Sequence, residues 1–291
     1  MPGNAWNLNG KNVLITGAAG GIGAATARLL AGRQMRLSLL DIQGPALQHL
    51  AGELGETMLY QQVDITQRDA LEEAVAATVE RFGHLDVAVV NAGIVTVGSV
   101  ERGDPEAFER VVNVNLLGSW KTVRAVLPHI IRARGYILFV SSLSGTIQGP
   151  LHAAYNSSKA GLQAFANTLR LGVKGLGVDV GVAHLIYTAT ETGRAAVEHP
   201  LMRGLPGLPE MKPLPVEKTA AMLVGGIERR SRTIIVPAAR LVLLTPDLFQ
   251  LAVFERMARR HRWSAAIQQL ERDSEGRAAA SLQAAQKETS I

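Results

Sequence analysis

Two side chains that can exchange protons stand four positions apart in the stretch AAYNSSKAG, residues 153–161. In a helix, Tyr155 and Lys159 would share one face, about 6 Å apart along the axis. A free phenol has a pKa near about 10 and is a poor base at neutral pH, but a nearby ammonium group favours phenolate and lowers that pKa. The pair can therefore serve as a general acid/base. The same spacing is also common on ordinary helix surfaces, so its meaning depends on the rest of the chain.

A glycine-rich turn near the amino terminus offers a second kind of chemistry. In VLITGAAGGIGAATARLLA an apolar run ends at Thr16, and Gly17, Gly21 and Gly23 lead into an alanine-rich helical pattern. Glycines at the start of a helix let backbone amides approach a phosphate without a Cβ in the way. A strand, a glycine turn and a helix in this order predict a seat for the pyrophosphate of a dinucleotide.

The residue that ends the second apolar run indicates which dinucleotide is bound. Asp41 lies 18 residues after Gly23, where a carboxylate can accept hydrogen bonds from both adenosine ribose hydroxyls and repel a 2′-phosphate. No arginine or lysine occupies positions 18, 19, 42 or 43. The sequence therefore predicts NAD rather than NADP. The alternative is that Asp41 is an ordinary turn residue after a strand.

Short apolar runs alternate with longer helical patterns along most of the chain. The runs are too short for helices and too continuously apolar for a half-exposed antiparallel sheet, so they predict parallel strands buried on both faces. We expect an α/β fold, a single doubly wound Rossmann domain with a sheet of about seven strands. The expected strands are 12–16, 36–41, 58–64, 85–91, 136–142, 178–185 and 233–237.

Two later segments depart from this alternation. Residues 187–215 are rich in proline and glycine and carry no strand signal, so we expect a mobile excursion. Its leucines and methionines can pack against the fold. We place the catalytic domain at 1–240 and a helical extension with a frayed tail at 241–291.

Taken together, these motifs resemble the short-chain dehydrogenase/reductase family, whose members carry T-G-x-x-x-G-x-G at the glycine turn. The resemblance covers about residues 10–190 and implies NAD(P)-dependent oxidoreductase activity on CH–OH groups. It also implies that the segment 187–215 covers the substrate, where its leucines and methionines would suit a lipophilic alcohol or ketone. It also implies a catalytic tetrad of matching residue types and separations, namely Asn115, Ser142, Tyr155 and Lys159.

The resemblance assigns a role to each member of the tetrad. Tyr155 would be the general acid/base, and Lys159 would lower its pKa and hold the nicotinamide ribose. Ser142 would hydrogen-bond the reacting oxygen, with Ser141 as the adjacent candidate. Asn115, by its side chain or a helix bend there, would hold a water that links Lys159 to solvent. Hydride would pass to or from the nicotinamide, whose chemistry the protein orients.

Further cofactor contacts follow from the resemblance. Asp64 and Ile65 would border the adenine, and the NAG stretch after the fourth strand would line it and steady the sheet. The full expected set is Gly17, Gly21, Ile22, Gly23, Asp41, Asp64, Ile65, Asn91, Ala92, Gly93, Tyr155, Lys159 and Thr188. The sequence departs from the family after the sixth strand, where His184 and Leu185 replace the usual Pro-Gly. We interpret His184 as structural, with a second acid/base as the alternative.

Composition narrows the class of protein. The chain has 291 residues, no cysteine and a net charge of +5, and its positive residues are scattered. These features exclude disulfides and thiolate metal sites, and we expect no metal and no nucleic acid partner. The amino end lacks the apolar core of a signal peptide, and no apolar run is long enough to span a bilayer. We expect a cytoplasmic protein.

The region 245–263 carries its own signal. Thr245, Pro246 and Asp247 are typical of a helix start, apolar residues recur at 248, 251, 254 and 257, and arginines gather at the end. Such a basic amphipathic helix can close the core, form an oligomer interface or lie on an anionic membrane. The family resemblance implies a homodimer or homotetramer through the helices near 105–132 and 155–174.

The leading hypothesis is a dehydrogenase or reductase that moves hydride between NAD(H) and a lipophilic secondary alcohol or ketone. One alternative is a catalytically silent NAD-binding regulator or scaffold, which would leave the tetrad unexplained. Another is a peripheral membrane protein whose tail is the main functional element. The sequence does not identify the substrate or the physiological direction.

Overall fold

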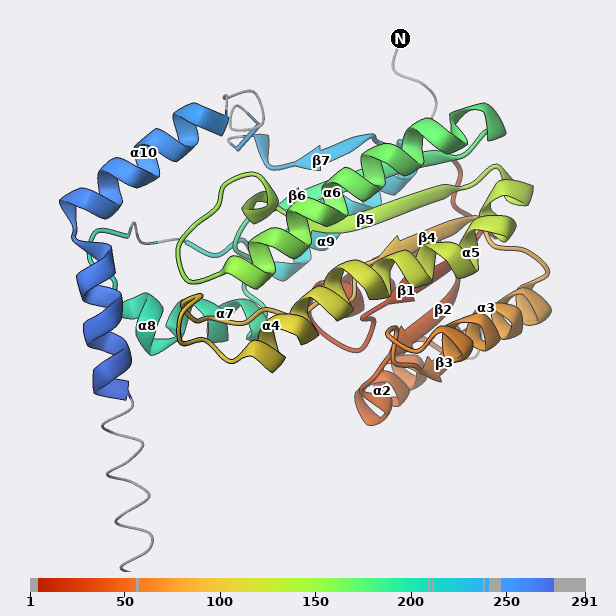
Figure 1. The fold of residues 1–291 in the computed structure, drawn as a ribbon. Helices are drawn as coiled ribbons and strands as arrows, with labels where there is room; N and C mark the ends of the chain where they lie inside the picture. The colour runs from red at the N-terminus through yellow and green to blue at the C-terminus, as the bar shows by residue number, and fades with distance from the viewer. Residues whose placement is uncertain are drawn as a thin grey trace, which may run out of the picture.

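The fold is a seven-stranded parallel sheet between two layers of helices (Figure 1). A computed structural model describes residues 5–55, 58–208, 210, 212–237, 239–240 and 247–274, without the side chains of 247–250. The strand order is β3-β2-β1-β4-β5-β6-β7, which confirms the doubly wound fold. The strands are β1 Asn12–Thr16, β2 Arg36–Asp41, β3 Met58–Gln62, β4 Val87–Val90, β5 Tyr136–Ser142, β6 Asp179–Leu185 and β7 Thr233–Ile235.

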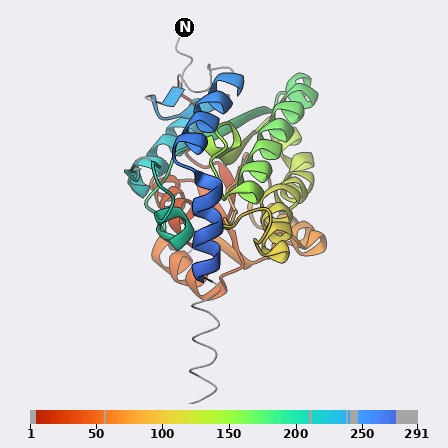
Figure 2. The same ribbon diagram turned by 60° about the vertical axis from the view of Figure 1, so that its left-hand side comes forward.

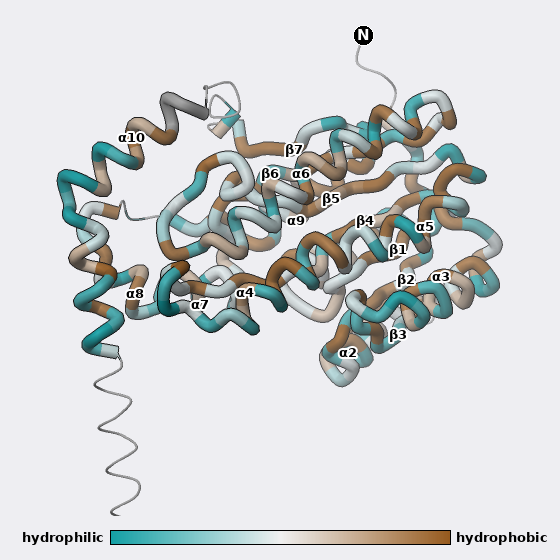
Figure 3. Tube along the Cα trace, viewed as in Figure 1, coloured by the Kyte–Doolittle hydropathy of each residue, from teal (hydrophilic) through white to brown (hydrophobic). Residues whose placement is uncertain are grey.

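The central strands are buried because helices cover both faces of the sheet. Every residue of β1, β4 and β5 is buried, and Figure 3 shows hydrophobic residues along these strands. Side chains alternate between the faces, so Leu138 joins one hydrophobic core while Phe139 joins the other. The strands are shorter than the predicted runs 58–64 and 85–91: β3 ends at Gln62, and β4 spans only Val87–Val90.

One face is covered by α1 Gly21–Ala31, α2 Gly44–Leu54 and α9 Val216–Glu228. The opposite face is covered by α3 Arg68–Phe82, α5 Ser119–Ala133 and α6 Ala153–Val173. A short helix, α4 Pro105–Val112, runs into α5 through a π-helical turn, η1 Asn113–Gly118. The two long helical regions expected from the sequence are therefore present, with this turn inside the first.

The predicted substrate-covering segment is more ordered than its composition indicates. Two short helices form there, α7 Glu191–Glu198 and α8 Pro200–Arg203. The Thr190 hydroxyl accepts the Gly193 amide at the start of α7, and Pro200 occupies the first turn of α8. Thr188 and Leu214 form a parallel bridge that closes the base of the segment. We call residues 187–215 the lid.

The C-terminal region forms two helices instead of the single one expected over 245–263. Helix α10 spans Asp247–Arg260, and a second helix covers 263–274. The break follows from Arg262, whose φ of 50° is left-handed and ends a helix. The predicted cap at Thr245 and Pro246 and most of the predicted frayed tail lie outside the described residues. In Figures 1 and 2 both helices lie at the end of the sheet where the strands finish.

Candidate active site

Tyr155 lies in the first turn of α6, next to the carboxyl end of β5. Its partly buried phenol lies within hydrogen-bonding reach of the Ser142 hydroxyl. Burial raises the pKa of Tyr155 above its ordinary value, and the hydrogen bond with Ser142 acts in the opposite direction. Without a further positive charge, Tyr155 is therefore a protonated hydroxyl at neutral pH.

Lys159 lies one helical turn further on, with its ammonium group inside the protein. The residue is only 5% exposed, and its Nζ donates a hydrogen bond to the Val140 carbonyl at 3.0 Å. The same nitrogen lies 5.7 Å from the centroid of the Tyr155 ring. Burial lowers the pKa of Lys159 from 10.5 to about 8. The geometry therefore places the ammonium group near the Tyr155 ring, as the spacing in the sequence predicts.

The two adjacent serines of β5 point in different directions because side chains alternate along a strand. Ser142 accepts the Ser144 amide at 3.1 Å and donates to the Leu185 carbonyl at 3.3 Å. Ser141 instead faces α6, where it donates to the Lys159 carbonyl at 3.4 Å. Only Ser142 is therefore placed beside the phenol.

Asn115 lies within the π-helical turn, fully buried. Its Oδ1 accepts the Ile94 amide at 2.8 Å, and its Nδ2 donates to the Ile94 carbonyl and to Ser158 Oγ. These bonds tie the loop after β4 to α6. A Cβ added to Gly93 would lie 3.1 Å from Asn115 Oδ1 and 3.4 Å from Lys159 Nζ. The expected helix bend is present, and the Asn115 side chain ties α6 to this bend.

The glycine turn is tight enough to let its backbone approach a phosphate closely. Gly17 and Gly21 have φ angles of 65° and 51°, in the left-handed region. A Cβ on Gly17 would lie 2.8 Å from the Ala92 Cα, and one on Gly23 would overlap the Gly17 carbonyl oxygen. Ile22 packs against the core below. The turn has no room for side chains at Gly17 and Gly23, which fits a pyrophosphate seat at the start of α1.

The NAG stretch holds this turn against β4. Asn91 Nδ2 donates to the carbonyls of Thr16 and Gly17, at 3.0 and 2.9 Å. The Thr16 hydroxyl accepts the backbone amides of Asn91 and Ala92. These four bonds join the ends of two neighbouring strands, and they steady the sheet at the site.

Two carboxylates predicted to contact the cofactor lie at the ends of neighbouring strands. Asp41 is the last residue of β2, and Asp64 lies two residues after β3. Asp41 accepts the Ala19 amide at 2.8 Å and the Gln43 amide at 3.0 Å, which fixes it beside the glycine turn. Asp64 accepts the Thr66 amide at 2.8 Å, and Ile65 is buried against the π-helical turn at Gly118. Both carboxylates are partly exposed at the edge where the strands finish.

The segment after β6 contains Thr188, the expected contact of the nicotinamide amide. Thr188 is 5% exposed, and its hydroxyl bonds with the Ile186 carbonyl and with Thr219 of α9. Thr190 instead lies against the glycine turn, where a Cβ on Gly21 would be 3.0 Å from its methyl carbon. Thr190 was missed from sequence, although its position before a new helix is a typical N-cap signal. Its methyl group therefore borders the glycine turn at the start of α1.

His184 lies in β6, in register with Ser141 of β5. Neighbouring side chains in register share a face, so His184 is directed toward α6 rather than toward the Ser142 hydroxyl. Burial lowers the pKa of His184, as does the charge of Arg170. This placement agrees with the structural interpretation of His184.

Gln163 is a second residue that sequence reasoning missed. Its amide nitrogen donates to the Ser142 carbonyl at 2.8 Å and to Ser141 Oγ at 3.2 Å. It stands on α6 two turns after Tyr155 and clamps that helix to the end of β5. No motif signals this role, because it depends on contact between two elements.

Comparisons with known proteins agree with this arrangement. Residues 11–200 match the sequence profile described as short chain dehydrogenase. The trans-4-hydroxycyclohexanecarboxylate dehydrogenase of Sinomonas cyclohexanicum is 34% identical over 183 residues, 60% of this chain and 71% of that protein. An uncharacterized NAD-dependent oxidoreductase of Mycobacterium tuberculosis is 34% identical over 202 residues, 63% of this chain and 74% of that protein.

Solved structures share the fold at lower identity. A 3-ketoacyl-(acyl-carrier-protein) reductase from Brucella melitensis, determined in complex with NADH, has a TM-score of 0.70 at 24% identity. That alignment covers 79% of this chain and 97% of the reductase. From the profile match and the relatives, the chain belongs to the short-chain dehydrogenase/reductase family of hydride-transferring oxidoreductases.

Proposed function

We propose that this protein uses NAD(H) to interconvert a lipophilic secondary alcohol and its ketone, with Tyr155 as the general acid/base. The observation that carries the proposal is the meeting of the Tyr155 phenol with Ser142 and the buried Lys159 ammonium, close to the glycine turn. The silent regulator or scaffold has no support from the comparisons, because the relatives are named as oxidoreductases.

Proton transfer is assigned to Tyr155. In ketone reduction its hydroxyl donates a proton to the substrate oxygen, and the raised pKa keeps that proton in place at neutral pH. In alcohol oxidation the phenolate must accept a proton. Lys159 and the positive ring of oxidised nicotinamide both favour phenolate, so oxidation is expected to accelerate as pH rises.

The other site residues orient the reactants. Ser142 hydrogen-bonds the reacting oxygen next to Tyr155, and Lys159 holds the nicotinamide ribose. Asn115 fixes the catalytic helix through Ser158 and borders Lys159 at Gly93. The nicotinamide, when bound, supplies the hydride acceptor or donor. Thr188 is the proposed contact of the nicotinamide amide, and Thr190 borders the glycine turn.

The preference for NAD rests on Asp41. Two backbone amides hold its carboxylate beside the glycine turn, and the residues that follow, Ile42 and Gln43, carry no positive charge. A 2′-phosphate would meet that carboxylate without a cation to balance it. The chain is therefore expected to bind NAD more tightly than NADP. The proposed adenine contacts are Asp64, Ile65 and the NAG stretch.

The lipophilic substrate class rests on the lid. Leu201, Met202, Leu205 and Leu208 pack together there, in a cluster that also contains Leu151 from the loop before Tyr155. Apolar side chains at this position favour an apolar substrate body beside the polar reacting group. The oligomeric state, cytoplasmic location and membrane contact remain predictions; among the described residues, no helix is long and apolar enough to cross a membrane.

A direct spectrophotometric assay tests the proposal. Purified full-length protein is mixed with NAD or NADP and a panel of secondary alcohols at alkaline pH, and absorbance of the reduced cofactor is followed. We expect turnover with NAD on apolar alcohols. Bound NAD without turnover on any alcohol or matching ketone would favour the silent regulator, and better turnover with NADP would refute the role of Asp41.

A further inference from the structure

The outer part of the lid, residues 200–208, has little core of its own. We call these residues the lid tip. Helices α7 and α8 contain no buried residue, and isolated helices this short are marginal in water. The base of the lid is fixed separately, by the bridge between Thr188 and Leu214 and by the bond between Thr188 and Thr219 of α9. The conformation of the lid tip therefore depends on the segments that pack against it.

The second C-terminal helix, residues 263–274, packs against the lid tip beside α8 (Figures 1 and 2). We call this helix the strap. Trp263 at its start is 5% exposed, and its Nε1 donates to the Pro206 carbonyl at 2.8 Å. A Cβ on Gly204 would overlap the side chain of Leu270, which stands two turns further along the strap. The strap therefore contacts the lid tip at two separate points.

The lid tip also contacts the loop that leads into the catalytic helix. Leu205 is buried in a hydrophobic cluster with Trp263 and Leu151. Leu151 lies four residues before Tyr155 in the sequence. Nearer its base, the lid borders the glycine turn through Thr190. The lid thus extends from the proposed pyrophosphate seat to the loop before Tyr155. The partly buried members of the cluster are Val97, Leu201, Met202, Leu208, Phe254, Met257, Ala258, Ala266 and Ile267.

We propose that the strap holds the lid over the active site and that Trp263 and Leu270 are positioning residues for substrate binding. Both act through the lid tip and need no contact with the substrate. The part of the proposal that concerns substrate binding rests on the proposed function. The strap lies beyond residues 11–200, which match the family profile.

Gly204 allows the contact to be tested from the lid side. Its φ of −78° and ψ of −9° are helical values that any residue adopts without strain. The obstacle to a side chain at this position is therefore Leu270 of the strap. Gly204→Val should force the strap and the lid tip apart. The double variant Gly204→Val, Leu270→Ala should restore the contact, because the second change removes as many carbon atoms as the first one adds.

Hydrogen exchange of the full-length protein measures the strap without any substrate. The amides of the lid tip should exchange about tenfold faster in Gly204→Val and return toward the parent rate in the double variant. Trp263→Phe keeps an aromatic ring and loses the bond to Pro206, so a smaller increase of about fivefold is expected. The matched control is Gly52→Val, because Gly52 of α2 has open space around it and lies outside the lid. It should leave lid exchange unchanged.

Steady-state kinetics measures the consequence for the substrate. The KM for the alcohol should rise about tenfold in Gly204→Val and recover in the double variant. The dissociation constant for NAD should stay within about twofold in every variant, since Thr188 and Thr219 hold the lid base without the strap. This split distinguishes loss of substrate positioning from a general loss of structure.

Unchanged lid exchange in Gly204→Val and Trp263→Phe would overturn the strap, as would a double variant that stays as fast as Gly204→Val. Faster exchange with an unchanged KM would overturn its role in substrate binding. A loss of NAD affinity as large as the rise in KM would also overturn that role, because the effect would not be confined to the substrate. If no alcohol or ketone is turned over while lid exchange follows the expected order, the proposed function fails and the strap stands.

Discussion

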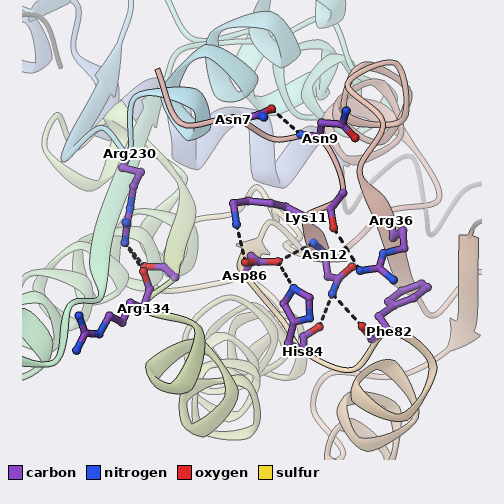
Figure 4. Close-up of polar contacts among 12 residues, drawn as sticks. Asn7, Asn9, Lys11, Asn12, Arg36, Phe82, His84, Asp86, Arg134 and Arg230 are labelled. Carbon is purple, nitrogen blue, oxygen red and sulfur yellow. Dashed lines mark hydrogen bonds and ion pairs between the residues drawn. The ribbon is translucent and has the colours of Figure 1, made fainter. Parts of the chain in front are cut away.

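The two ends of the sheet differ in whether a buried charge has a partner of opposite charge. At the amino end, Asp86 is 3% exposed and accepts the Lys11 ammonium at 3.0 Å and the Asn12 amide at 2.9 Å (Figure 4). At the carboxyl end, the buried Lys159 ammonium has the Val140 carbonyl as its described partner, with no carboxylate bonded to it among the described residues. A charge is neutralised at the first end and left poorly compensated at the second.

More contacts reinforce the amino end. Trp6 has the charged groups of Lys11 and Arg230 each 4.8 Å from its ring. Arg230 also donates to the Arg134 carbonyl, and Asn12 donates to the His84 carbonyl (Figure 4). These bonds connect segments far apart in the sequence, so this end contributes to stability rather than to chemistry.

The difference shows where the fold tolerates the unfavourable free energy of a buried charge without a partner. A buried ammonium without a carboxylate partner is unfavourable, and it persists only where the surrounding structure is stable enough to impose it. The uncompensated charge lies beside the Tyr155 phenol, where it favours phenolate. The paired end supplies stability that the reactive end does not. Variants at the two ends should therefore separate activity from stability.

The largest expected effect is on turnover, from Tyr155→Phe. Removing the hydroxyl removes the proton donor and acceptor, so kcat should fall about 10²-fold to 10⁴-fold. The NAD dissociation constant and the free energy of unfolding should change little, because the ring remains. Stopped-flow turnover and calorimetric NAD binding check this. Substantial activity in the phenylalanine variant would exclude Tyr155 as the acid/base and remove the proposed chemistry from this end.

At the opposite end, Asp86→Ala should mainly lower stability. It leaves the Lys11 ammonium and the Asn12 amide without their acceptor, and we expect a loss of about 3 kcal/mol in the free energy of unfolding. The kcat should stay within about twofold, since the change is remote from Tyr155. Urea denaturation gives the first quantity and steady-state kinetics the second.

A matched control for Asp86 is Glu53→Ala, which breaks an exposed ion pair with Arg28. Exposed pairs contribute little because water screens them, so a much smaller loss is expected. Equal losses in the two variants would show that burial does not set the contribution of Asp86. The contrast between the ends would then lose its basis in stability.

These outcomes bear on how much of the protein could be predicted from its sequence. The strands were accessible because apolar runs determine them, and the proximity of Lys159 to Tyr155 was accessible because helical spacing determines it. The Asp86 contacts were not, since Lys11 and Asp86 are 75 residues apart and neither lies in a motif. The approach of Thr190 to the glycine turn was not accessible either, since Thr190 and Gly21 are far apart in the sequence.

The C-terminal region shows the same limit. Periodicity predicted an amphipathic helix, and α10 is one. No local pattern indicated that the helix would end at Arg260, or that Trp263 would bond Pro206 of the lid. Contacts between distant segments depend on shape and packing, which the sequence pattern does not contain.

Lys159→Met tests the cost of the uncompensated charge. Burial lowers the pKa of Lys159 in the folded protein to about 8, against 10.5 ordinarily. Below pH 8 both states carry the proton, and the folded state bears the full cost. Between about 8 and 10.5 only the unfolded state keeps it, so stability from this group rises with pH.

The free energy of unfolding of the methionine variant should therefore be about 3 kcal/mol higher than that of the parent at pH 7. That advantage should shrink as pH rises past about 8 and vanish above about 10.5. Urea denaturation of both proteins at several pH values, without cofactor, measures it. The kcat of the methionine variant should fall even though the variant is more stable, because the ammonium group beside Tyr155 is lost. A variant less stable than the parent at pH 7 would mean that Lys159 is well compensated, and the two ends would no longer differ.

The smallest expected effect is from His184→Ala, which tests whether the reactive end contains a second acid/base. The His184 Nδ1 is buried and has no hydrogen-bond partner among the described residues, and the strand register directs the side chain toward α6. Because it does not share a face with Ser142, its loss should lower kcat less than about threefold, as expected for a residue acting only through packing. The pH dependence of kcat should keep its shape, since Tyr155 sets it. A large loss of kcat with unchanged NAD affinity would instead make His184 a proton carrier, and proton transfer at this end would then involve two groups.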